Sequence, residues 1–243
     1  MFFAIISISG ISSVQTILKD SDEMATQLYE WYQTERLKSG NAFIGDIVYF
    51  GSYEQDNNLY TGKEKIEWHV LDVKDGKALL LSKYALDVQP YDKLFADTAW
   101  DSCSMRIWLN ETFMNTAFTT DEQEKILFSE ICADRNPQYD TKQGNSTNDK
   151  VFLLSIAEVG AYLSSQSILD CTPTKYAEAL GVHCFKSKDN NPSCRWWLRS
   201  IGGDQKSAAV VMPYGNINCS GSTVNHENNA IRPAIWIQLG SDS

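Results

Sequence analysis

Two stretches near the C-terminus indicate the fold: Cys194-Arg195-Trp196-Trp197-Leu198-Arg199-Ser200 and Ile231-Arg232-Pro233-Ala234-Ile235-Trp236-Ile237. Both are short runs rich in β-branched and aromatic residues, and Gly and Asn turns divide the sequence between them. This pattern predicts three or four short strands in an antiparallel meander, with a final strand over residues 230–239. Pro233 cannot donate a hydrogen bond to a strand ladder, so we expect it at an edge or a bulge.

The sequence before this tail mixes strand and helix patterns. Residues 66–82 predict a β-hairpin, because two apolar runs flank the turn Lys74-Asp75-Gly76. Residues 102–116 place apolar side chains on one helical face. Capping boxes at Thr120 and Ser155 predict two further short helices. The sequence therefore predicts an α+β fold of mixed short strands, with a C-terminal antiparallel meander and several short helices.

The tail resembles that of an uncharacterised bacterial domain family. The motif Trp-Trp-Leu-Arg-Ser at 196–200 and the triplet Arg-Pro-Ala at 232–234 carry the resemblance, which covers about residues 42–239. That family is similar to the C-type-lectin-like fold of formylglycine-generating enzymes and of the variable proteins of diversity-generating retroelements. The resemblance implies a C-type-lectin-like fold for this chain, but a fold alone implies no function.

Side-chain alternation gives expectations for the motif residues. Trp196 and Trp197 are neighbours on one predicted strand and point to opposite faces, so at most one should lie in the core. Arg199 and Arg232 are expected to be partly buried and paired with carbonyls or carboxylates. In the same way, Trp108 and Trp236 have apolar neighbours at the right period and are expected to be mostly buried.

Length and charge limit the domain organisation and the partners. A chain of 243 residues can bury a sizeable core, and we expect an N-terminal apolar segment and helix over residues 1–40 followed by one domain over residues 41–240. The chain has 21 basic and 31 acidic residues and a net charge of −10. This balance argues against a nucleic-acid partner, which requires clustered positive charge.

The first 18 residues carry no charge, and a helix is expected from residue 20 to residue 39. A secretory signal would need a basic start and a small-residue cleavage site, and neither is present. Residues 1–18 are either the remnant of a longer signal or anchor, or an apolar segment that packs on the domain. The first alternative implies the cell surface or secretion, and the second implies the cytoplasm. No membrane insertion of the main domain is expected.

The six cysteines show no C-x-x-C spacing, so no metal or other cofactor is expected. Cys184 and Cys194 bracket a polar loop and are the first candidates for a disulfide. The alternative is six unpaired thiols. The resemblance also implies an alternative function, a copper oxidase of the formylglycine-generating type. Such an enzyme would need a close cysteine pair near the C-terminus, a pattern that Cys194 and Cys219 do not match.

Polar residues crowd the predicted turns of the tail. Asn, Ser and His side chains near aromatic residues suit adaptable recognition on loops. The candidate binding residues are Trp196, Asn216, Asn218, Asn225, His226, Glu227, Asn228 and Asn229. The alternative is that these asparagines only form turns, because Asn tolerates left-handed backbone geometry.

The interpretation that follows is a non-catalytic module that binds an unknown protein or glycan. Trp196 or Trp197 would supply an aromatic floor for the ligand. In the retroelement variable proteins that the tail resembles, the diversified positions lie in this C-terminal segment. The resemblance therefore also implies a variable recognition protein as one form of the binding module.

Overall fold

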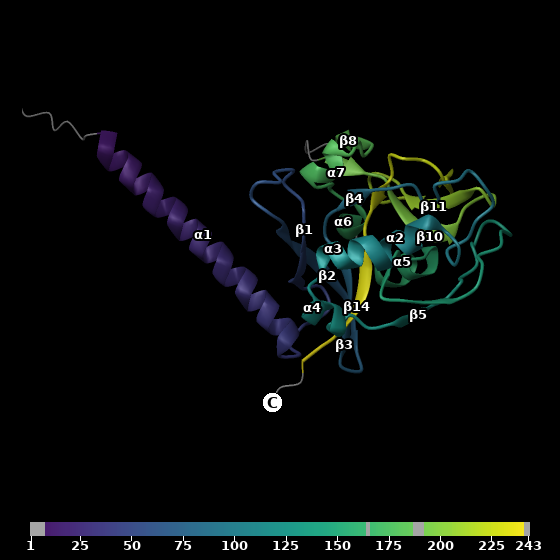
Figure 1. Ribbon diagram of the computed structural model, residues 1–243, viewed down its shortest axis with the longest axis horizontal. Helices are drawn as coiled ribbons and strands as arrows, with labels where there is room; N and C mark the ends of the chain where they lie inside the picture. Colours follow the sequence, from purple (N-terminus) through teal and green to yellow (C-terminus); the bar gives the residue numbers. More distant parts are fainter. Residues whose placement is uncertain (1–7, 164–165, 187–191, 241–243) are drawn as a thin grey trace, which may run out of the picture.

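The computed structural model describes residues 8–163, 166–186 and 192–240. A long helix, α1 (Ile8–Lys38), extends away from a body that contains two five-stranded sheets (Figure 1). Helices and sheets are both well represented, which confirms the α+β class. Within the described residues, no helix combines the length and apolar character that crossing a bilayer requires.

The first sheet has the strand order β1-β2-β3-β14-β7, and every neighbouring pair in it is antiparallel. The predicted hairpin over residues 66–82 is confirmed, because Asp75 and Gly76 both adopt the positive φ that a tight turn requires. The strands are β1 (Ile47–Tyr53), β2 (Glu64–Lys74), β3 (Lys77–Ser82), β14 (Ala234–Gln238) and β7 (Val151–Phe152).

The second sheet contains the predicted meander. It has the order β12-β11-β10-β13-β4, and the β10–β11 and β11–β12 pairs are antiparallel. However, β13 runs parallel to β10, so the meander ends at β12. The strands are β12 (Ile217–Thr223), β11 (Ser207–Val211), β10 (Trp196–Ile201), β13 (Ala230–Ile231) and β4 (Asp87–Val88).

The predicted single strand over residues 230–239 is wrong, because it is two strands in different sheets. Arg232 and Pro233 make the crossing between β13 and β14. The carbonyl of Pro233 accepts from the Ser82 N–H at 3.0 Å, and Arg232 Nε donates to the Ser82 carbonyl at 2.7 Å. The chain changes sheets here because Pro233 has no N–H with which to continue the ladder.

Short helices and two small hairpins complete the described fold. The Ser155–Glu158 capping box is confirmed, but the other box pairs Thr119 with Glu122 and therefore begins one residue earlier than predicted. The helices are α2 (Ser104–Trp108), the π-helix η1 (Leu109–Phe113), α3 (Met114–Ala117), α4 (Thr120–Lys125), α5 (Ile156–Tyr162), α6 (Gln166–Leu169) and α7 (Lys175–Ala179). The two hairpins are β5 (Ser129–Ile131) with β6 (Thr147–Asp149), and β8 (Cys184–Lys186) with β9 (Pro192–Cys194).

The core corrects the expectation for the tryptophan pair. Trp196 and Trp197 are both fully buried, because both faces of β10 are covered. The Trp196 indole N–H donates to the Leu169 carbonyl, and the Trp197 indole N–H donates to the Gln89 carbonyl. A buried indole keeps its hydrogen bond in this way, so neither ring needs the surface.

Trp108 and Trp236 lie at the edge of the core and pack against it with a minor part of each side chain exposed, so the prediction that both are mostly buried is confirmed. Trp236 is a partly exposed residue of β14. The ammonium groups of Lys74 and Lys77 lie 4.9 and 5.3 Å from the centroid of its ring. Cationic side chains thus cover the part of this indole that the core leaves exposed.

Helix α1 begins earlier than predicted, since Asp20 and Ser21 lie inside it. Met24, Leu28 and Trp31 share a helical face as predicted, but that face is exposed. Only the last turns pack on the body, where Leu37 is buried. Residues 8–18 belong to the part of α1 that extends away from the sheets (Figure 1), and residues 1–7 lie outside the described residues.

Candidate functional site

The polar turns of the tail flank one end of the second sheet. The start of β12, the end of β11 and the starts of β10 and β13 are in register across this sheet. Asn216 directly precedes β12, and Asn229 directly precedes β13. The two turns therefore lie at the same end, with β11 and β10 between them.

The turn over residues 225–229 is tied to the segment that enters β8. The His183 N–H donates to the Asn228 carbonyl at 3.0 Å, and Asn228 Nδ2 donates to the Gly181 carbonyl at 2.7 Å. Asn225, Glu227 and Asn228 are exposed. Two segments that are far apart in sequence thus form one surface beside the start of β10.

Asn229 connects this surface to the start of β10. Its side chain is fully buried, and its Oδ1 accepts a hydrogen bond from Arg195 Nε at 2.6 Å. Its Nδ2 has no hydrogen-bond partner, and it is the one buried side-chain nitrogen or oxygen in this condition among the described residues. Leaving a buried donor unpaired costs about 1–3 kcal/mol.

Arg195 is half-buried, and it makes no ion pair with any carboxylate in the described part of the chain. Burial lowers the pKa of this guanidinium, although it keeps its charge at neutral pH. A partly desolvated charge without a counter-charge is unfavourable in the free protein. Arg195 is therefore available to pair with an anion.

His226 adds a second donor beside Arg195. Its Nδ1 accepts from the Asn228 N–H at 3.2 Å, so in the neutral ring the proton is on Nε2. Burial, Arg195 and His183 lower the pKa of His226, and only Glu227 opposes them. His226 Nε2 lies 3.5 Å from Arg195 Nη2. Both nitrogens are donors, so they cannot satisfy each other, but one anionic oxygen could accept from both.

An aromatic pair borders these donors. The rings of His183 and Phe185 stack with centroids 4.7 Å apart at an angle of 15°, and Phe185 is 41% exposed. The surface thus combines unpaired donors with an apolar edge. We call it the C-terminal corner, and its residues are His183, Phe185, Arg195, His226 and Asn229.

The structure places the sequence-predicted binding residues in different environments. Asn225–Asn229 border or belong to the C-terminal corner, while Asn216 is exposed at the neighbouring turn. Asn218 lies on β12, and its Oδ1 accepts from the backbone N–H groups of Ser220 and Gly221, so this side chain orders the backbone of that strand. Trp196 is buried and cannot be a ligand floor, which corrects that expectation. Asn229 is also buried, and it reaches the corner only through its side-chain amide.

Three residues of the corner were missed by sequence reasoning. Arg195 stands in the quoted tail motif, but its neighbours are all core residues and gave no reason to separate it from them. His183 and Phe185 lie at least 40 residues before the turn over residues 225–229. Tertiary contacts of Asn228 with Gly181 and His183 bring them there.

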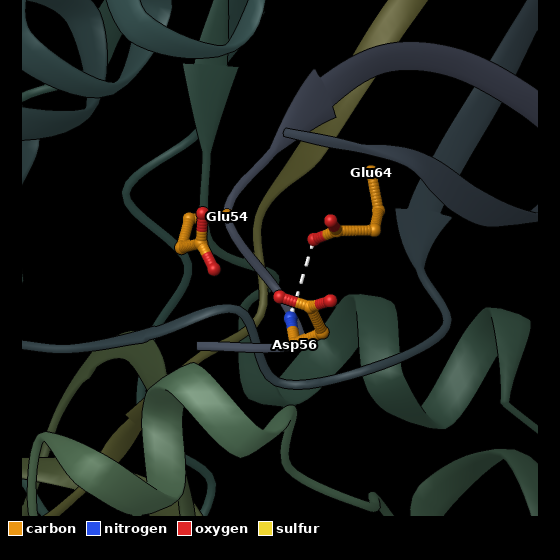
Figure 2. A group of neighbouring side chains, drawn as sticks. All are labelled: Glu54, Asp56 and Glu64. Atoms are coloured by element: carbon orange, nitrogen blue, oxygen red, sulfur yellow. Dashed lines mark hydrogen bonds between the residues drawn. The ribbon is translucent and has the colours of Figure 1, made fainter. Parts of the chain in front are cut away.

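One cluster of acidic side chains offers oxygen ligands of the kind that bind metal ions. Glu54, Asp56 and Glu64 bring carboxylate oxygens within 4.8 Å of one another at the loop that joins β1 to β2, the only such group among the described residues (Figure 2). Oxygen ligands of this kind suit Ca²⁺. However, each carboxylate already accepts a hydrogen bond from a backbone N–H. Glu64 accepts from the N–H groups of Gln55 and Asp56. Glu54 and Asp56 both accept from the N–H of Asn58. These bonds order the loop between the strands.

The cysteines of the oxidase alternative do not line a described cavity. Cys194 contacts Cys171, with its Sγ 3.3 Å from the Cys171 carbonyl oxygen, and both residues are fully buried. Cys219 lies on β12, which is not adjacent to β9. A cavity of about 420 Å³ does lie elsewhere, between the end of α1 and strands β1 and β14, and its lining contains no cysteine.

A comparison with protein families identifies the chain. A family model described as a domain of unknown function (DUF6273) matches residues 75–239. The chain therefore belongs to this family. The match covers the second half of the β2–β3 hairpin, both motif segments and the whole C-terminal corner. Neither a comparison with curated proteins nor one with solved structures returned a match.

Proposed function

We propose that this protein is a non-catalytic binding module whose C-terminal corner binds a carboxylate group of a protein or glycan ligand. The observation that carries the proposal is the pair of nitrogens Arg195 Nη2 and His226 Nε2, which lie 3.5 Å apart. Both are donors, because His226 Nδ1 accepts from the Asn228 N–H. A carboxylate presents two acceptor oxygens and one negative charge. It would satisfy both donors and neutralise Arg195.

The surroundings of the donors support recognition rather than catalysis. The corner contains no serine, cysteine or carboxylate within hydrogen-bonding distance of the Arg195–His226 pair among the described contacts. His226, with its lowered pKa, is neutral at pH 7 and donates through Nε2. The stacked rings of His183 and Phe185 offer an apolar edge against which a sugar ring or an aliphatic side chain can pack.

For the architecture, we propose a C-type-lectin-like fold. The support is the arrangement of two sheets, with the last strand, β14, returning between β3 and β7 in the first sheet. This architecture would present the C-terminal turns as loops on a rigid frame. A variable recognition protein is one form of such a module, and the exposed residues Asn216, Asn225 and Asn228 are positions where change would leave the core intact.

The test uses two carboxylate probes from different sources, glucuronate for glycans and N-acetylglutamate for proteins, with glucose as the neutral control. Calorimetric or NMR titration of the full chain should show saturable binding of at least one carboxylate and none of glucose. Tighter binding of glucuronate would indicate a glycan ligand, and tighter binding of N-acetylglutamate would indicate a protein ligand. Equal responses to glucose and both carboxylates would contradict the proposal.

Two matched variants locate the binding. Arg195→Gln should abolish the response, because it removes the charge and keeps a polar side chain. Arg135→Gln makes the same charge change on an exposed side chain. That residue precedes Asn136, which binds the Ile201 carbonyl at the opposite end of β10, so this variant should bind as the unchanged protein does. Equal loss in both variants would indicate a general charge effect rather than a site.

A further inference from the structure

Cysteines lie directly behind the C-terminal corner. Cys184 on β8 and Cys194 on β9 are direct partners in the antiparallel register of this hairpin. All six cysteines are free thiols in the structure. Cys184 is half-buried, whereas Cys194 is fully buried. The two thiols therefore differ in their access to a reagent, although their backbones face each other.

The hydrogen-bond pattern shows which kind of pair this is. The Cys194 N–H donates to the carbonyl of Cys171 at 2.9 Å, on the side away from β8. Cys184 and Cys194 are consequently a non-hydrogen-bonded antiparallel pair. In such pairs the Cα atoms lie about 4.5 Å apart and the side chains are closest. This separation is within the range of about 4.4–6.8 Å that disulfides span.

We propose that Cys184 and Cys194 form a disulfide that clamps β8 to β9. The clamp joins the two segments that carry the corner, since His183 and Phe185 flank Cys184 and Arg195 follows Cys194. Its formation rests on the strand register alone. Its benefit to ligand binding rests in addition on the proposed function.

The reaction needs an oxidant, and a small-molecule disulfide such as oxidised glutathione supplies it. The Cys184 thiolate attacks one sulfur of the reagent, forms a mixed disulfide and releases one glutathione thiolate. The Cys194 thiolate then attacks the Cys184 sulfur and releases the second. The protein loses two protons and two electrons, the reagent is reduced, and two glutathione molecules leave.

The surroundings favour a structural disulfide over a rapidly cycling one. Burial, with the nearby Glu178, raises the pKa of Cys184 to about 11. Its thiolate is therefore scarce at neutral pH, and oxidation should accelerate as the pH rises. A metal centre built on Cys171, Cys184 and Cys194 is not supported. The three sulfurs are not among the described groups whose ligand atoms all lie within 4.8 Å of one another.

The experiment oxidises the reduced full chain with oxidised glutathione at pH 8.5. We expect the intact mass to fall by two hydrogens and non-reducing peptide mapping to join the peptides of Cys184 and Cys194. The Tm should rise by about 5–10 °C, since a ring of this size removes denatured-state entropy. Cys184→Ser should abolish all three changes without disturbing the core, and Cys219→Ser should retain them.

Three outcomes would overturn the proposal: an unchanged mass, a lasting glutathione adduct on Cys184, or a bridge between Cys194 and Cys171. Titration of the reduced protein with glucuronate and N-acetylglutamate reports the corner separately. If the reduced chain binds a carboxylate but forms no bridge, the disulfide fails and the proposed function stands. If the bridge forms and neither the oxidised nor the reduced chain binds a carboxylate, the disulfide stands and the proposed function fails.

Discussion

The interior between the two sheets and the C-terminal corner both depend on arginines of the tail, but they use them in opposite ways. Arg232 is fully buried, and its guanidinium donates to the carbonyls of Ser82, Lys83 and Ile168. Arg195 is only half-buried, has one protein acceptor, and lies beside another donor. An arginine with satisfied donors holds the fold together, whereas one with unsatisfied donors is available to a ligand.

Arg199 belongs with Arg232 in this comparison. It is 3% exposed and contacts the carboxylates of Glu158 and Asp134 and the carbonyl of Leu153. These contacts confirm the expectation that both arginines are buried and paired. The identical residue type in one short tail therefore serves two purposes, and burial and the number of unpaired donors distinguish them.

The largest expected effect is at Arg232. Arg232→Ala removes the donor to three carbonyls, of which that of Ser82 is buried, and opens a cavity beside Trp196, whose ring centroid lies 5.1 Å from the guanidinium. The free energy of unfolding should fall by about 4 kcal/mol or more. Urea unfolding followed by tryptophan fluorescence measures it, with Arg135→Ala as the exposed control. A loss below about 1 kcal/mol would show that this arginine does not hold the sheets.

The tryptophans sharpen the same contrast between interior and surface. Trp196→Ala should cost about 3–5 kcal/mol, because the side chain is fully buried. Trp236→Ala should cost about half as much, since that side chain is only partly buried. Denaturant midpoints of the two variants test this order, and equal losses would contradict the difference in burial.

A histidine near Arg232 gives the interior a pH dependence. Burial, with the charges of Arg232 and Lys83, lowers the pKa of His69 from 6.5 to about 4. The unfolded chain binds this proton first, so the contribution to stability is complete above about pH 6.5 and is lost as the pH falls toward 4. The full change in pKa corresponds to about 3 kcal/mol, and solvent screening of this partly exposed ring reduces the expected loss to about 2 kcal/mol. His69→Gln should remove this part of the pH dependence, and an unchanged pH profile in that variant would refute the assignment.

The smallest expected effect on stability is in the corner. Arg195→Gln should change the free energy of unfolding by less than about 1 kcal/mol, because removing a half-buried unpaired charge offsets the lost hydrogen bond to Asn229. The same urea titration measures this value. A loss as large as that of Arg232→Ala would make Arg195 a structural residue and remove the basis of the proposed site.

Local sequence was sufficient for some of these features and insufficient for others. The β2–β3 hairpin follows from Asp75 and Gly76, whose backbone preferences fix a tight turn without help from the rest of the chain. The division of the last strand at Pro233 depends on Ser82, which lies far away in sequence on β3. Alternation correctly gives Trp196 and Trp197 opposite faces, but it cannot show whether both faces are covered.

Only the part of the candidate site that is local in sequence could be predicted. The polar turn over residues 225–229 is visible as a cluster in the sequence, so its exposed members could be named. Arg195 becomes distinct from Arg199 and Arg232 only once their partners are known. The orphaned amide of Asn229 and the donor pair at Arg195 and His226 are tertiary features. No local pattern encodes them.

The most direct test of this contrast observes the three arginines in one spectrum. Arginine side-chain Nε–Hε NMR signals, assigned with single Arg→Gln variants, can be followed while glucuronate or N-acetylglutamate is added to the full chain. The account predicts a saturable shift of the Arg195 signal and unchanged signals for Arg199 and Arg232. An unmoved Arg195 signal, or equal shifts at all three arginines, would contradict it.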